Sequence, residues 1–255
     1  MFKDVIQAIG GAARKLFSNW GALLISFALY AALIGVLYLF FTTREATMTQ
    51  VVLSVAILPL AAILLFFSLQ GMGISYVRIG VGALYQFKRA LRDSWLLLVI
   101  SLPLLALCWA FVHYVGDPDP KLMNPWIESR AWLRETVWAL WYPLLYVIFP
   151  LIAIHWWIAA AREGLGGALK GTARNIGRAL SPRSVLIYLL NIAVFGAGAY
   201  FLFFTKIHLK SEWGELWLFG ARFALGLVLV FLGWMLTLGA MAEMTARRAI
   251  GELEG

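Results

Sequence analysis

An all-α membrane protein with six transmembrane helices is the fold that the sequence predicts. Of the 255 residues, 62% are hydrophobic and only 13% are charged, which leaves too few charged side chains to cover a soluble domain. Six apolar runs each match or exceed the roughly 20 residues that a helix needs to cross a hydrocarbon core. None of the runs alternates in polarity as a transmembrane strand would.

The six predicted transmembrane segments cover residues 20–41, 51–74, 95–115, 132–161, 185–204 and 216–244. The first run is longer than the apolar core of a cleavable leader, about 7–15 residues, so we expect it to be retained. Prolines in the later runs are expected to kink their helices. Pro59 and Pro143 stand at matching distances before Gly82 and Gly167, which predicts kinks at equivalent depth in the second and fourth segments.

One unit, a basic amphipathic segment followed by two apolar runs, occurs three times. This pattern predicts a single membrane domain over residues 1–255, built as three hairpins in the repeats 1–76, 77–161 and 162–248. Short motifs rich in glycine and alanine open the units at residues 9–12, 79–84 and 165–169. Residues 247–253 resemble the opening of a further, unfinished unit.

Each of the three linkers places apolar residues on one helical face and basic residues on the other. The apolar positions are Phe2, Val5, Ile6, Ile9 and Leu16 in the first, Val77, Val81, Leu84 and Leu91 in the second, and Leu165, Leu169, Ile176 and Leu180 in the third. We expect these helices to lie at the membrane interface, with the apolar face among the acyl chains and the basic face toward anionic headgroups.

The basic residues expected to bind lipid headgroups or a partner are Arg14, Lys15, Arg78, Arg89, Arg92, Lys170, Arg174 and Arg178. Two interpretations stay open. The linkers are either lipid-anchored connectors, or together they form a docking platform for a cytoplasmic protein. We refer to the three segments as the basic linkers.

Orientation follows from the distribution of lysine and arginine. The side that holds both termini carries the whole net charge of +8, which by the positive-inside rule places both termini in the cytoplasm of a bacterial inner membrane. The expected partners are the bilayer with its anionic lipids and other membrane or cytoplasmic subunits. No nucleic acid is expected, because the basic residues are divided among short segments and form no single accessible stripe.

Polar residues inside the spans are few, and three of them are candidates for a functional role: His155, Asn191 and Gln70. His155 and His113 lie at different predicted depths, so we do not expect them to hold a haem together. Packing or a single hydrogen bond is the expectation for each histidine.

No reactive constellation occurs in the sequence. Cys108 is the single cysteine, which excludes a disulfide framework and a thiolate metal site. The acidic residues Asp117, Asp119 and Glu128 of the long outer loop match no calcium-binding spacing. Because there is also no Ser-His-Asp set, HExxH motif or P-loop, we predict no catalytic site, no metal and no cofactor.

One resemblance adds to this interpretation. The stretch from Pro150-Leu151 through Arg162 to Leu169, followed by a basic helix over 174–190, is similar to poorly characterised bacterial six-helix proteins related to membrane domains of glycerophosphodiester phosphodiesterases. The likeness covers the last four segments and transfers no catalytic residue, because the activity of that group lies in a separate soluble domain. It implies a polytopic helper or scaffold.

The expected function is a non-enzymatic membrane scaffold or subunit of a larger complex, with a small-molecule or lipid permease as the alternative. A permease needs a polar route through the midplane. Candidates for that route are His155, Ser54, Ser68, Gln70, Ser101, Asn191 and Thr237. We expect these side chains to bond to neighbouring helices without converging on one cavity.

Overall fold

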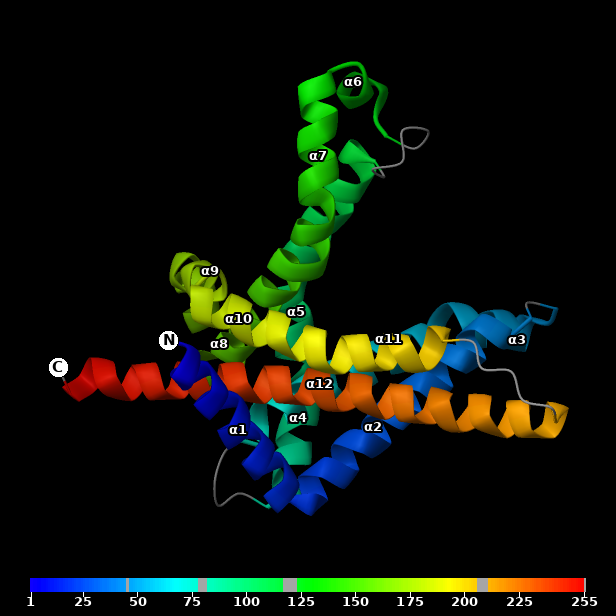
Figure 1. The fold of residues 1–255 in the computed structure, drawn as a ribbon, viewed down its shortest axis with the longest axis horizontal. Coiled ribbons are helices and arrows are strands. Elements are labelled where there is room, and N and C mark those ends of the chain that lie inside the picture. The colour runs from blue at the N-terminus through cyan, green and yellow to red at the C-terminus, as the bar shows by residue number, and fades with distance from the viewer. Residues whose placement is uncertain (45, 78–81, 117–122, 206–210, 255) are drawn as a thin grey trace. The chain divides into compact units, whose positions relative to one another are not determined.

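The computed structural model describes residues 1–44, 46–77, 82–116, 123–205 and 211–254, with the backbone alone for 247–254 (Figure 1). Most of these residues are helical, with no strand among them and one isolated β-bridge between Gly116 and Met123. Six helical stretches of the described residues are long and apolar enough to cross a membrane, which confirms the prediction of an all-helical chain with six candidate spans. They are Trp20–Thr42, Met48–Ser75, Ala83–Val115, Ala131–Lys170, Pro182–Phe204 and Glu212–Ala246.

The chain divides into two compact units. The first comprises Met1–Ser94 together with Leu186–Gly255, and the second comprises Trp95–Val185. Two helices, α5 (Ala83–Val115) and α10 (Pro182–Asn191), cross the boundary.

The first unit contains eight further elements in its described residues. They are α1 (Phe2–Ser18), α2 (Trp20–Thr42), α3 (Met48–Val52), the π-helical η1 (Leu53–Ile57), α4 (Leu58–Ser75), the π-helical η3 (Ile192–Gly196), α11 (Ala197–Phe204) and α12 (Glu212–Glu254). Asn19 separates α1 from α2, because its side chain accepts a hydrogen bond of 3.1 Å from the backbone N–H of Ala22 and so caps the new helix.

Helix α12 contacts α1, α4 and α11, and α11 lies alongside it (Figure 1). Close approach of α4 to α12 depends on glycine, since a Cβ on Gly73 or on Gly239 would overlap Leu238 or Tyr76 respectively. Tyr76 follows the end of α4 and donates a hydrogen bond of 3.1 Å to the carbonyl of Met235 on α12. The core of this unit therefore forms around the half of α12 nearer the C-terminus.

Three π-helical turns interrupt the described spans, and two of them precede a proline. In η1, Leu58 N–H donates to Leu53 O five residues earlier, and η2 and η3 close in the same way. Pro59 and Pro150 each stand two residues after such a turn. Proline lacks an N–H and its ring crowds the carbonyl four residues before it, and the wider turn relieves that crowding. The structure thus places equivalent turns before Pro59 and Pro150, whereas the sequence register paired Pro59 with Pro143.

The second unit holds α6 (Pro125–Glu128), α7 (Ala131–Pro143), the π-helical η2 (Leu144–Ile148), α8 (Phe149–Lys170) and α9 (Thr172–Ala179). Aromatic contacts join α5 to the α7–α8 span: the Phe111 ring centroid lies 4.9 Å from that of Trp141 and 6.3 Å from that of Phe149. Helix α8 breaks at Gly164, whose φ of 73° is favourable only for glycine. This break separates the apolar span from the third basic linker.

Candidate functional site

The first basic linker packs on protein through part of the face that we expected to lie among acyl chains. Val5 and Leu16 are fully buried and α1 contacts α12, so the prediction for these two residues was wrong. Phe2 and Ile6, also on the predicted apolar face, are exposed. The predicted apolar face of α1 therefore consists of two stripes. One stripe is buried against the bundle, and the other remains exposed and available to lipid.

An ion pair joins this linker to the last span. Lys15 Nζ lies 3.3 Å from Glu243 Oε2, and the Glu243 side chain is only 8% exposed. A Cβ on Gly11 would lie 2.9 Å from Glu243 Oε1, so a glycine at this position gives the carboxylate room against the backbone of α1. Burial, and secondarily the charge of Glu243, raises the pKa of Tyr76. Tyr76 therefore keeps its hydroxyl proton for the bond to α12.

In the second basic linker, the two described arginines lie beside one aspartate. Arg89 Nε lies 3.3 Å from Asp93 Oδ2, and Arg92 Nε lies 3.0 Å from Asp93 Oδ1. Arg92 is well exposed and Arg89 is half-buried. The predicted docking residue Arg78 lies outside the described residues.

The second linker is continuous with the third span, because α5 runs unbroken from Ala83 to Val115. Leu84 and Leu91, predicted to face the acyl chains, are 61% and 50% exposed. The opposite side of this helix buries Gln86 and Ala90. Small and polar residues thus face the protein, while the large apolar residues remain on the surface as the sequence indicated.

The third linker folds back on itself beyond Gly164. Arg174 Nη2 lies 3.1 Å from Glu163 Oε2 across the break. The side-chain amide of Asn175 donates a hydrogen bond of 3.3 Å to the carbonyl of Ala168, which joins α9 to the end of α8. Lys170 is exposed and Arg178 is half-buried. Of the predicted docking cations, this linker therefore presents Lys170 most openly.

His155 belongs to a buried hydrogen-bond chain in the second unit. Its Nε2 lies 3.0 Å from Ser184 Oγ, and Ser184 Oγ donates a bond of 2.9 Å to the carbonyl of Arg178. Because the serine hydroxyl has one hydrogen and gives it to that carbonyl, His155 Nε2 is the donor to Ser184. The chain fixes the start of α10 against α8.

The other two intramembrane candidates lie in the first unit. Gln70 is 1% exposed, and its Oε1 accepts a hydrogen bond of 2.7 Å from Trp234 Nε1, which connects α4 to α12. Asn191 donates from Nδ2 to the carbonyl of Ile187 on its own helix, at 3.0 Å.

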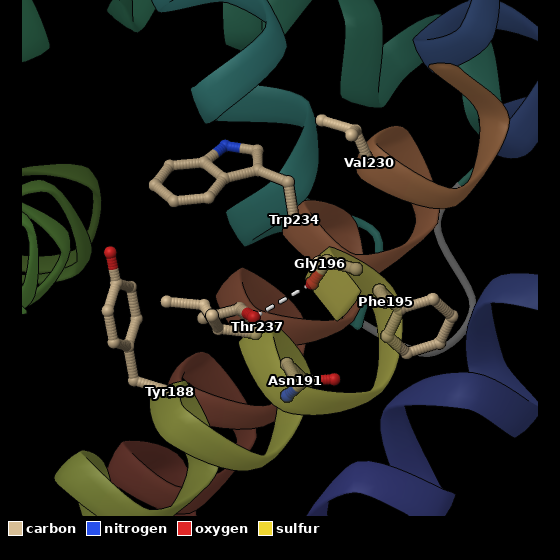
Figure 2. A pocket seen from close by; sticks show the side chains of 9 residues that line it. Tyr188, Asn191, Phe195, Gly196, Val230, Trp234 and Thr237 are labelled. Atoms are coloured by element: carbon tan, nitrogen blue, oxygen red, sulfur yellow. Dashed lines mark hydrogen bonds between the residues drawn. The ribbon is translucent and has the colours of Figure 1, made fainter. Parts of the chain in front are cut away.

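Two of the polar residues considered for a transport route line the same pocket. Asn191 and Thr237 line one pocket between α10 and α12, but Thr237 donates its hydroxyl hydrogen to Gly233 O, 2.7 Å away on its own helix (Figure 2). Ser101 and His155 belong to the second unit, where Ser101 accepts a bond of 2.7 Å from Trp157 Nε1.

Sequence reasoning missed Glu243 as an ion-pair partner and Trp234 as a hydrogen-bond donor. Their partners Lys15 and Gln70 are 228 and 164 residues away, so no local spacing signals either contact. A carboxylate inside the last apolar run was the available signal for Glu243, because such a charge needs a partner when it is not at the surface.

No set of three or more histidine, cysteine, aspartate or glutamate side chains in the described part of the chain is placed to hold a metal ion. Comparison with known proteins finds no matching family model, no matching curated protein and no matching solved structure.

Proposed function

We propose that the chain is a non-enzymatic scaffold or subunit of a larger assembly in the bacterial cytoplasmic membrane, with both termini in the cytoplasm. One observation carries the proposal. Six of the seven candidate polar side chains, all but Ser68, bond to a neighbouring helix or to their own helix, as do Gln70 with Trp234 and His155 with Ser184. Such bonds hold helices together, whereas a permease needs polar groups that are turned toward one route.

The three-hairpin organisation with an interfacial helix before each hairpin is part of the proposal. It is supported by the contact of α2 with α4, of α5 with the α7–α8 span, and of α11 with α12. The capped break at Asn19 and the glycine break at Gly164 support separate interfacial segments in the first and third repeats.

The basic linkers are the proposed docking surfaces. Arg14, Lys88 and Lys170 come from different linkers, are exposed, and form no ion pair with another described residue. Each is therefore available to an anionic headgroup or to an acidic partner. Each cation contributes about 1 kcal/mol of binding free energy near an anionic membrane surface.

Replacing Arg14, Lys88 and Lys170 together by Gln tests the proposal without breaking a described ion pair. The matched control replaces Arg44, Lys121 and Arg134, on the predicted outer side, by Gln. Both variants and the parent are purified from the native host in mild detergent, and the co-purifying lipids and proteins are identified by mass spectrometry.

Loss of a specific co-purifying protein only from the inner-side variant would support a docking platform. Loss of anionic lipid alone would identify the linkers as lipid anchors. If the parent protein co-purifies with no partner and transports a solute across liposome membranes, the scaffold proposal is wrong and the permease is favoured.

A further inference from the structure

A pocket of about 190 Å³ lies between two helical segments. One segment is the end of α10 with η3, and the other is α12. All of its lining residues belong to the first unit. Figure 2 shows the rings of Tyr188 and Trp234 on one side of the two helices, with Thr237 between them. The lining comes from the central parts of the spans Pro182–Phe204 and Glu212–Ala246, so it lies at the level of the acyl chains.

Local backbone structure creates this space. The π-helical turn η3 inserts an extra residue into the span, and such turns are frequent at functional sites. Gly196 ends η3 and contributes no side chain to the pocket. A Cβ on Gly196 would meet only Ile192 Cγ2, at 3.4 Å, so close packing does not require a glycine there. The pocket thus lies beside Gly196, where η3 and α12 contact each other and no side chain of residue 196 fills the space.

Three donor groups of the lining are directed to protein partners, and the lining as a whole is mainly apolar. Asn191 Nδ2 donates to Ile187 O, Thr237 Oγ1 to Gly233 O, and Trp234 Nε1 to Gln70 Oε1. The surface left to an occupant is therefore mainly hydrocarbon and aromatic ring. A polar solute would have to give up its own hydrogen bonds with water to enter such a pocket.

The rim of the pocket is continuous with the outer apolar surface of the spans. Ile192 and Val230 both line the pocket and are 46% and 42% exposed. Val194 and Leu225, nearby in the two spans, are also exposed. In a bilayer this surface faces acyl chains, which can reach the pocket without crossing water.

We propose that this pocket binds one acyl chain of a membrane lipid. An apolar cavity of about 150 Å³ already holds a benzene molecule, so this volume accommodates a segment of several methylene groups. Recognition is of the hydrocarbon chain, since the lining offers no cation to a headgroup. The proposal does not rest on the scaffold function and goes beyond it.

The test uses liposomes that contain phosphatidylethanolamine or phosphatidylglycerol with a diazirine in the middle of one acyl chain. After irradiation, adducts are mapped by peptide mass spectrometry. We expect adducts to concentrate at residues 188–196 and 230–237, with equal yield for the two headgroups. Adducts spread evenly over the exposed apolar residues, or a yield that depends on the headgroup, would overturn the proposal.

Substitution of the pocket glycine supplies the matched comparison. Gly196→Leu places a side chain in the pocket, whereas Gly220→Leu adds the same side chain to α12 where nothing lies within 4 Å of the new Cβ. We expect Gly196→Leu to lower the adduct yield about tenfold, the factor that corresponds to losing the burial of two methylene groups. Gly220→Leu should leave the yield unchanged, and equal yields in both variants would contradict the proposal.

A rim variant covers the case in which Gly196→Leu does not fold. Val230→Phe enlarges a partly exposed side chain at the rim of the pocket. It should lower the yield at residues 188–196 while adducts elsewhere on the protein persist. An unchanged yield at those residues would again overturn the proposal.

Discussion

The ammonium of Lys15 and the carboxylate of Glu243 lie 3.3 Å apart, and this ion pair joins the first helix of the chain to the last. Glu243 is nearly buried, while the Lys15 side chain is 28% exposed. A carboxylate taken out of water is stabilised by a nearby cation and strongly destabilised without one. The pair therefore holds α1 on α12 at a position where propensity and amphipathicity alone would leave α1 free to lie on lipid.

Lys15→Met should destabilise the protein by about 2 kcal/mol, less than for a fully buried pair because Lys15 is partly exposed. Glu243→Gln should lower the free energy of unfolding by less than Lys15→Met does, because it removes the buried negative charge and with it the need for a neighbouring cation. Unfolding in mixed micelles with increasing SDS measures both variants. Lys3→Met removes an exposed cation from the same helix and is the control; if Lys15→Met behaved like it, the pair would carry no stabilising role.

Gly239→Ala should destabilise the protein by about 2 kcal/mol, because overpacking a fixed contact displaces buried groups. Its new Cβ would overlap the hydroxyl of Tyr76, a side chain that is 2% exposed and bonded to Met235 O. Gly35→Ala is the control, since nothing lies within 4 Å of its new Cβ. Helix propensity favours alanine at position 35 by about 1 kcal/mol, so the Tm should rise for Gly35→Ala and fall for Gly239→Ala.

The Gln70–Trp234 hydrogen bond should contribute about 0.6 kcal/mol of coupling energy, the average for interhelical bonds in a membrane protein. The cycle consists of Gln70→Leu, Trp234→Phe and the double variant, each measured by SDS unfolding. Trp234→Phe leaves the buried Gln70 amide oxygen without its donor. It should therefore lower the free energy of unfolding more in the parent protein than in the Gln70→Leu background. Additive single effects would show that the two residues are not coupled.

The spans were predictable because their signal is local. Run length and apolar content decide whether a helix crosses a hydrocarbon core, and both are visible within about 20 residues of sequence. The exposed positions Leu84 and Leu91 followed from the same periodicity, since lipid selects large apolar side chains on one face.

The contacts inside the bundle were not predictable, because they join residues far apart in the chain. Val5 and Leu16 have the character expected of a lipid-facing stripe, and the sequence does not distinguish burial against acyl chains from burial against α12. The π-helical turns also lacked a signal, because η3 occurs without a proline. In the candidate site, residue types indicated which side chains carry charge but not that Glu243 lies beside Lys15.

The charge distribution predicts that Arg44 lies outside the cell and that Lys88 and Lys170 lie in the cytoplasm. All three side chains are exposed, so a cysteine at each position is accessible from its own side of the membrane. In a Cys108→Ala background, an impermeant maleimide added to intact cells should label position 44 and should label positions 88 and 170 only after the cells are opened. Cys108 must be removed first because it is the chain's only cysteine. Labelling of position 170 in intact cells would reverse the orientation and, with it, the assignment of the basic linkers to the cytoplasmic surface.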